Sequence, residues 1–186
     1  MSTAARLAWL LMVVVWVAGA FRNKRTVRGM ARTDLIVHVL VLAAAFDLLL
    51  APGLRRGALA YRLVPDSGWI EDVGGLLQIA GIAFAIWARL HIGRNWSGTV
   101  TLKEGHALVR SGPYAWVRHP IYSGLVLAAF GLALEHGELG GTLGFLLLTV
   151  EWKRKSMLEE RLMIEQLGEE YKQYRREVKG LVPGIW

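Results

Sequence analysis

Cysteine is absent from this chain of 186 residues, and its absence excludes three kinds of chemistry. The chain forms no disulfide bond, no thiolate zinc site and no cysteine nucleophile. It also has no low-complexity tract and no collagen-like or heptad repeat. The function must therefore be sought in other side chains and in the pattern of apolar residues.

Charged residues are scarce: they make up 20% of the chain, whereas hydrophobic residues make up 54% and the mean hydropathy is +0.35. A soluble domain usually carries about 25% charged and about 45–50% apolar residues. The apolar residues fall into blocks with the charges crowded between them, which disfavours a soluble enzyme. The net charge of +7 then indicates a membrane surface or an anionic ligand as the partner, rather than nucleic acid.

Five apolar blocks divide the chain, and each is a candidate transmembrane helix. They cover residues 7–21, 35–51, 69–92, 121–134 and 139–152. The last two, at about 21 Å, are shorter than a hydrocarbon core of about 30 Å, so they must borrow flanking residues, thin the bilayer or stop short inside the protein. The first block also resembles the core of a signal peptide, but most of its flanking basic residues follow it, which favours a retained helix. Because four residues separate the last two blocks, these two helices are expected to form an antiparallel hairpin. We predict an all-α integral membrane protein with five transmembrane helices.

The basic residues predict how the chain lies in the bilayer. If the segment after the first helix is cytoplasmic, 18 Lys and Arg side chains lie inside and 4 lie outside. Positive charge accumulates on the cytoplasmic side of membrane proteins. The split predicts an outside N-terminus and a cytoplasmic C-terminus, and it requires an odd number of helices.

Two features inside the apolar blocks leave alternatives open. His38 and Asp47 are ionisable residues within the second block, and such residues are functional candidates by default. Asp47 lies close to the outer end of its block, where it can simply reach the interface. Glycines at four-residue spacing in residues 137–144 permit close helix contact, either within the monomer or across a dimer.

The loop at residues 93–119 is expected to carry a small β-hairpin on the cytoplasmic membrane surface. Its residues 99–102 alternate between Thr and an apolar residue, residues 103–105 form a turn, and residues 106–109 return as a second strand. A cytoplasmic loop with strands would set this segment apart from the helices around it.

The end of the same loop predicts a ligand site. A turn at residues 111–114 leads to Pro120, which suits the first turn of a helix because its missing N–H costs nothing there. The free N–H groups of that helix and its positive dipole then lie beside Arg118 and His119. The arrangement fits an anion or a polar ligand; alternatively, the two side chains only anchor the chain to lipid phosphates.

The tail is expected to continue the fifth helix into the cytoplasm as an amphipathic helix. Gly168 interrupts it, and a second short helix begins at Glu169. Glu159 and Glu160 lie one to two turns beyond the predicted membrane boundary. They are either solvated surface residues or ligands for a cation or for hydroxyl groups.

Two motifs stand in this half of the chain: GPYAWVRHPIYSG at residues 112–124, and Glu159-Glu160 followed by GEEYxxY at residues 168–174. Together, in this order and with a helical hairpin between them, they resemble the signatures of the isoprenylcysteine carboxyl methyltransferase family. The resemblance covers residues 95–183, roughly half of the chain. The residues before it match only as generic membrane helices.

The resemblance implies an integral-membrane methyltransferase that uses S-adenosylmethionine. Residues 1–92 would supply three N-terminal helices, and residues 93–186 would form the cofactor-binding catalytic part. The sulfonium and ammonium of the cofactor favour carboxylates, and its own carboxylate favours N–H groups or a cation. The residues implied at the cofactor are His106, Leu108, Val109, Gly112, Tyr114, His119, Pro120, Tyr122, Glu159 and Glu160.

The implied acceptor is lipophilic, an isoprenylcysteine-like carboxylate that enters from the bilayer. Such a carboxylate is ionised at neutral pH, so it needs a cation to orient it rather than a base. Arg118, Arg154 and Lys155 are the candidates for this catalytic role. The family usually has an Arg where Lys155 stands, and a Lys keeps the charge but loses the bidentate geometry.

Other functions fit parts of the same pattern. A phospholipid amine or a small thiol is an alternative acceptor, but it would need a base, either His119 or a glutamate. The related sterol reductases use NADPH, and no arginine pocket for its 2′-phosphate is evident here. A non-catalytic membrane adaptor with a basic cytoplasmic face is the alternative from another class. No metal site is expected.

Overall fold

The computed structural model describes residues 2–20, 26–29, 31–50, 56–93, 96, 101–103 and 108–182. Five long helices match the five predicted blocks: α1 (Thr3–Ala20), α2 (Arg32–Leu50), α3 (Gly68–Ile92), α4 (Pro120–His136) and α5 (Leu139–Leu167). A shorter helix, α6 (Glu169–Glu177), follows α5, and the loops hold the 3-10 turns η1 (Gly57–Ala60) and η3 (Gly112–Ala115). The prediction of a helical protein is confirmed.

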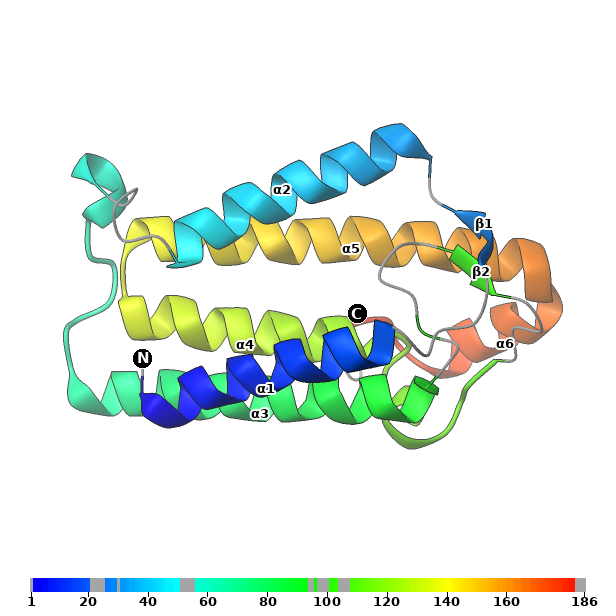
Figure 1. Ribbon diagram of the computed structural model, residues 1–186, viewed down its shortest axis with the longest axis horizontal. Coiled ribbons are helices and arrows are strands. Elements are labelled where there is room, and N and C mark those ends of the chain that lie inside the picture. The colour runs from blue at the N-terminus through cyan, green and yellow to red at the C-terminus, as the bar shows by residue number, and fades with distance from the viewer. Residues whose placement is uncertain are drawn as a thin grey trace.

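The long helices run lengthwise beside one another, as Figure 1 shows. α4 packs between α3 and α5, while α1 packs on α3 and α2 packs on α5. The N-terminal end of α4 and the C-terminal half of α5 lie at the same end of the molecule as η3 and α6 (Figure 1). The two sequence motifs therefore meet at this end.

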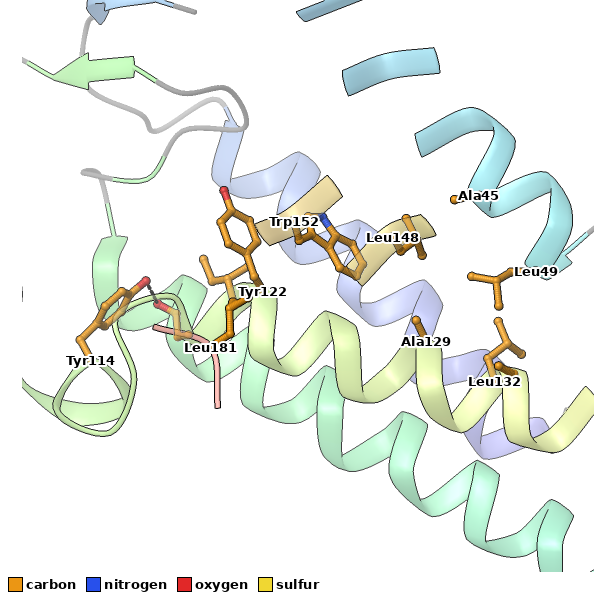
Figure 2. Packing of buried hydrophobic residues seen from close by; sticks show 12 residues of the cluster. Ala45, Leu49, Tyr114, Tyr122, Ala129, Leu132, Leu148, Trp152 and Leu181 are labelled. Carbon is orange, nitrogen blue, oxygen red and sulfur yellow. Dashed lines mark hydrogen bonds between the residues drawn. The ribbon is translucent and has the colours of Figure 1, made fainter. Parts of the chain in front are cut away.

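The apolar core lies between α2, α4 and α5, and it extends toward that end. Figure 2 shows Leu49 of α2 and Leu132 of α4 on facing sides of the core, and both are 1% exposed. Trp152 of α5 and Tyr122 of α4 lie next to each other where the core reaches the motif end. The apolar core therefore packs against Tyr122 of the first motif.

Apolar side chains are exposed along α1, α2 and α3. Leu10 of α1 and Leu40 of α2 are 61% and 64% exposed. Of the described helices, α2 and α3 are long and apolar enough to cross a membrane, and α1 and α4 are shorter apolar helices. Exposed apolar side chains along long helices are what a lipid environment accommodates.

Glycines bring the backbones of α3 and α4 into contact. A Cβ on Gly81 would lie 2.4 Å from the carbonyl oxygen of Gly124, and one on Gly124 would lie 2.5 Å from that of Gly81. Gly74 and Gly131 repeat this arrangement, with distances of 2.7 and 2.5 Å. Small residues of this kind let membrane helices approach closely. The pairing fixes α4, and thus its N-terminal end, against α3.

Gly81→Ala is expected to lower the melting temperature of the protein in detergent. Its Cβ would meet backbone atoms, which cannot rotate away, and overpacking of this kind costs about 1–3 kcal/mol. Gly141→Ala is the matched control, because the nearest packing neighbour of its Cβ would be the Cβ of His136, at 3.6 Å. Equal melting temperatures for the two variants would contradict the close α3–α4 contact.

The predicted α4–α5 hairpin is confirmed. Gly137 ends α4 in the left-handed conformation (φ 68°), its N–H bonds to the Ala133 carbonyl at 2.9 Å, and α5 begins at Leu139. Gly144 packs against α2, where a Cβ would lie 2.8 Å from the Ala45 carbonyl oxygen. The glycine-rich start of α5 thus serves packing within the chain.

The helical course of the tail and its interruption at Gly168 also follow the prediction. α5 continues without a break to Leu167, a helix of 29 residues. Gly168, with φ 55°, separates it from α6. The glutamates of the second motif are therefore carried on the same rigid helix that forms the hairpin.

The strand partner in the 93–119 loop differs from the expected one. Residues Thr101–Lys103 form β2, which pairs antiparallel with β1 (Thr26–Gly29), the segment between α1 and α2. Residues 108–109, the described part of the expected return strand, are not in a strand, and residues 104–107 lie outside the described residues. The hairpin prediction paired neighbouring segments, whereas the described pairing joins segments far apart in sequence.

Candidate active site

The site begins at the N-terminal end of α4. Pro120 is the first residue of this helix, as predicted, and His119 is its N-cap residue. Tyr122 follows nearly one turn later, and its ring stacks on the His119 ring with centroids 5.8 Å apart. His119 is 8% exposed and Tyr122 is 9% exposed, so the pair forms a buried wall beside the helix end.

Two carboxylates of α5 reach this wall. The Tyr122 hydroxyl donates to Glu159 Oε1 at 2.6 Å. His119 Nε2 lies 3.0 Å from Glu160 Oε1, and its Nδ1 lies 3.5 Å from Glu159 Oε2. Glu160 is buried, with 7% of its surface exposed, so the alternative that it is a solvated surface residue is wrong. His119 thus lies between two carboxylates.

Cations surround the Glu160 carboxylate. Arg118 Nε and Nη2 lie 2.9 and 2.7 Å from Glu160 Oε1, and Arg175 Nε of α6 lies 3.3 Å from Oε2. Arg118 Nη1 also donates to the carbonyl oxygens of Val178 and Arg175. The Arg118 side chain is 9% exposed, and in the structure it binds protein oxygens rather than facing lipid phosphates.

A C-terminal strap, residues 178–181, holds the backbone of the first motif. The N–H groups of Arg118 and His119 donate to the carbonyl oxygens of Lys179 and Gly180 at 2.8 and 3.0 Å. The Ser123 hydroxyl donates to the Leu181 carbonyl at 2.5 Å. The strap therefore fixes the position of the two side chains that meet Glu160.

Tyrosines support the turn that precedes the site. The Tyr174 hydroxyl of α6 donates to the Tyr114 carbonyl at 2.6 Å, and the Tyr114 hydroxyl donates to the Ala88 carbonyl of α3 at 3.4 Å. Burial raises the pKa of Tyr174 to about 12, so its hydroxyl stays protonated and remains a donor. The turn at η3 is thus held between α3 and α6.

The site is charged at neutral pH. Burial favours neutral His119, but the hydrogen bonds that His119 donates to the Glu159 and Glu160 carboxylates, together with their negative charges, outweigh burial and raise the pKa of His119. Burial likewise favours neutral Glu160, yet His119 and Arg118 lower its pKa to about 2. The pKa of Glu159 is also lowered, because His119, Lys155 and Tyr122 together outweigh its burial.

These pKa shifts predict acid sensitivity. The pKa of a glutamate is 4.5 in the unfolded chain, and the pKa of Glu160 is about 2 in the folded protein. Ionised Glu160 therefore stabilises the fold above pH 4.5. This contribution is lost as the pH falls from 4.5 toward 2. The melting temperature of Glu160→Gln should therefore fall less over that range than the wild-type value. If the melting temperatures of Glu160→Gln and wild type fall in parallel over this pH range, the low pKa of Glu160 is contradicted.

Apart from Pro120, the other described residues implied at the cofactor lie in the segment 108–114, which leads through η3 to α4. Leu108 and Val109 are half-buried, and Val109 packs against the core. Gly112 adopts φ 58°, and a Cβ there would lie 2.7 Å from the His91 ring, so glycine is required. His106 lies outside the described residues. The predicted residues that the structure brings into direct contact are His119, Tyr122, Glu159 and Glu160.

The three candidate cations lie in different surroundings. Arg118 binds Glu160, as described above. Arg154 donates to Glu151 at 2.8 and 2.9 Å and to Asp34 of α2 at 2.9 Å, on the side of α5 that faces α2. Lys155 is 4% exposed, and its Nζ lies 5.5 Å from the centroid of the Tyr122 ring.

Sequence reasoning missed two parts of the site. Arg175 contacts Glu160 from α6, and its position next to Tyr174 in the second motif is the signal that points to it. The C-terminal strap has no such signal, because its contacts are made by backbone carbonyls, which any residue supplies.

Comparisons with known proteins connect this site with one family. Residues 75–165 match the model of the isoprenylcysteine carboxyl methyltransferase family. A protein-S-isoprenylcysteine O-methyltransferase of Schizosaccharomyces pombe is 36% identical over 103 residues, which are 53% of this chain and 43% of that protein. A probable protein-S-isoprenylcysteine O-methyltransferase of Oryza sativa is 28% identical over 171 residues, 90% of this chain and 87% of that protein.

A solved structure shares the fold. It is that of the eukaryotic intramembrane Ras methyltransferase, with a TM-score of 0.53 and 24% identity, and the match covers 86% of this chain and 55% of that one. The chain thus spans about half the length of this protein and less than half of the yeast relative. The fold is similar to that of this intramembrane protein, and residues 75–165, just under half of the chain, are similar to the isoprenylcysteine carboxyl methyltransferase family.

Proposed function

We propose that this protein is a membrane methyltransferase that uses S-adenosylmethionine to methylate the carboxylate of a lipophilic, isoprenylcysteine-like acceptor. One observation carries the proposal: His119 and Tyr122 at the start of α4 converge on Glu159 and Glu160 of α5. These are the residues that the family motifs imply at the cofactor.

The chemistry of these residues fits the cofactor. S-adenosylmethionine carries a sulfonium and an ammonium, and the two ionised glutamates supply the matching negative charge. Its carboxylate needs N–H donors or a cation, which the start of α4 and its flanking basic residues supply. The residues proposed to hold it are His106, Leu108, Val109, Gly112, Tyr114, His119, Pro120, Tyr122, Glu159 and Glu160.

The protein's own part in the reaction is alignment. When bound, the cofactor supplies a methyl group on a positively charged sulfur, and transfer forms a bond to a carboxylate oxygen while the C–S electron pair returns to sulfur. The acceptor carboxylate is ionised, so no proton has to move. The protein aligns the two partners and excludes water from them. Arg118, Arg154 and Lys155 are the candidate cations from which the one that orients the acceptor is drawn.

The electrostatics of His119 favour a carboxylate acceptor over an amine or a thiol. Those acceptors must lose a proton, and a general base has to be unprotonated to take it. The pKa of His119 is raised, because Glu159 and Glu160 stabilise its protonated form. A histidine whose protonated form is stabilised in this way is less available to take a proton from an acceptor.

The proposed membrane arrangement follows the charge distribution. Five helices cross the bilayer, the N-terminus lies outside, and the C-terminus and the active site face the cytoplasm, as the 18-to-4 split of basic residues favours. The acceptor then reaches the site sideways from the bilayer, and the polar cofactor reaches it from the cytoplasm.

Calorimetric titration of the purified protein in detergent tests the proposal. We expect S-adenosylmethionine and its demethylated product, S-adenosylhomocysteine, to bind in the micromolar range, and NADPH not to bind. A flat titration of folded protein with both compounds would overturn the proposal in favour of a non-catalytic membrane protein. Binding of NADPH instead would favour a reductase.

A further inference from the structure

A second polar cluster lies just before the glutamate pair on α5, and α2 contributes to it. The buried residues of α2 in the described part of the chain are His38, Ala45 and Leu49. Ile36 and Leu40, which flank His38, are 58% and 64% exposed, whereas His38 is 6% exposed. The helix is therefore rotated so that the His38 imidazole faces inward while Ile36 and Leu40 face outward.

His38 bridges a carboxylate and an ammonium. Its Nδ1 lies 2.7 Å from Glu151 Oε1, and Lys155 Nζ lies 3.5 Å from its Nε2. A neutral imidazole meets both contacts if Nδ1–H donates to the carboxylate and the lone pair of Nε2 accepts from the ammonium. Glu151 thus sets the tautomer, and the tautomer directs Nε2 at Lys155.

The same cluster leads directly to the candidate active site. The Lys155 ammonium lies over the Tyr122 ring, at 5.5 Å from its centroid, and the Tyr122 hydroxyl donates to Glu159. Lys155 and Glu159 are also one helical turn apart on α5. The ammonium is therefore placed beside the stacked His119 and Tyr122 rings, on the side toward the apolar helices.

The two other candidate cations are engaged elsewhere. The three guanidinium nitrogens of Arg118 donate to Glu160 and to two carbonyl oxygens. Those of Arg154 donate to Glu151 and Asp34. Arg154 also neutralises Glu151, so the charge that this cluster presents toward Tyr122 is the Lys155 ammonium.

We propose that His38 and Glu151 are positioning residues that hold the Lys155 ammonium beside Tyr122, where it orients the carboxylate of the acceptor. This inference rests on the proposed function and assigns the acceptor-binding cation within it. A lysine ammonium is a point charge on a flexible stem, so it needs support that the planar fork of an arginine supplies by itself. An acceptor carboxylate that leaves water must also keep a positive partner.

A double-mutant cycle tests the coupling between His38 and Lys155. The measured quantity is kcat/KM for the acceptor N-acetyl-S-farnesylcysteine, for wild type, His38→Ala, Lys155→Gln and the double variant. We expect about a tenfold loss for His38→Ala, mostly through KM, and about a hundredfold loss for Lys155→Gln. The double variant should be no worse than Lys155→Gln alone, because His38 acts through Lys155.

Asp47→Asn is the matched control, because Asp47 is the other ionisable residue within the apolar part of α2 and is exposed. Its kcat/KM should equal that of wild type. His38→Asn is a second variant that keeps a donor toward Glu151 but loses the acceptor at Nε2, so it isolates the Lys155 contact. Titration with S-adenosylhomocysteine reports whether each variant retains a folded site, and its Kd should stay within about threefold of wild type.

The outcomes separate this inference from the proposed function. Two results would show that His38 only joins two helices and would overturn the inference. One is a kcat/KM loss in the double variant equal to the product of the two single-variant losses; the other is a lower melting temperature of His38→Ala with an unchanged KM. In both cases S-adenosylhomocysteine still binds and the proposed function stands. Folded wild type that binds no S-adenosylhomocysteine would instead overturn the proposed function itself.

Discussion

Glu160→Gln is expected to weaken the binding of S-adenosylhomocysteine by about 1.5–3 kcal/mol, a 10- to 150-fold rise in Kd. Gln keeps the shape of the side chain but removes the negative charge. In the structure this charge is held by His119, Arg118 and Arg175, and the site offers it to a cationic ligand. Calorimetric titration of the variant in detergent measures the effect.

The control for this prediction is Glu170→Gln. Glu170 is an exposed glutamate of α6, so its variant should bind S-adenosylhomocysteine like wild type. Glu159→Gln should weaken binding as well, since the Tyr122 hydroxyl and His119 both contact this carboxylate. Unchanged affinity in both Glu159→Gln and Glu160→Gln would remove these residues from the cofactor site.

Arg118→Ala is expected to reduce the affinity for S-adenosylhomocysteine about tenfold and to lower the melting temperature, since removing one partner of a buried ion pair costs about 3–5 kcal/mol. The sequence alone predicts a different result: Arg118 orients the acceptor, so Arg118→Ala lowers the rate of methyl transfer and leaves cofactor affinity within a few-fold of wild type. The structure changes that expectation, because the guanidinium lies on Glu160 and on the Val178 carbonyl. Loss of Arg118 leaves the Glu160 carboxylate displaced.

Two further variants make the Arg118 result specific. Arg118→Lys should recover part of the affinity, because it restores the charge without the forked donors. Arg176→Ala, which changes an exposed arginine of α6, should leave affinity and melting temperature unchanged. If Arg118→Ala lowers turnover while its Kd equals that of wild type, Arg118 contacts the acceptor, as the sequence alone predicts.

The helices and the helical hairpin were predictable because their signals are local. Each apolar block is continuous in sequence, and a glycine marks the end of α4 at Gly137 and of α5 at Gly168. The meeting of the two motifs follows from the hairpin, since its open ends lie side by side. The same reasoning predicts that His119 and Glu160 lie at the same end of the molecule.

The parts that the sequence does not reveal depend on contacts between distant segments. β2 pairs with β1, which lies more than seventy residues earlier in the chain, and no residue pattern in either strand specifies that partner. The C-terminal strap contacts Arg118 through backbone groups. Gly81 and Gly124 lie in different helices, so their pairing is not visible as a spacing within one segment.

The inward position of His38 is a further case. α2 is apolar almost all round, so no amphipathic pattern indicates which face of the helix is buried. The rotation is set by the polar partners on α5, Glu151 and Lys155. A residue that the sequence marks only as an ionisable group in a membrane helix thereby becomes part of a specific cluster.

Methyl transfer to a defined acceptor tests the central claim most directly. Purified protein would be incubated with S-adenosylmethionine labelled in its methyl group and with N-acetyl-S-farnesylcysteine, and the lipid product treated with alkali. We expect the lipid product to carry the labelled methyl group, and alkali to release that label as methanol, because alkali hydrolyses a carboxyl methyl ester. Label that remains in an alkali-stable amine or thioether product, or no transfer by protein that binds S-adenosylhomocysteine, would contradict this expectation.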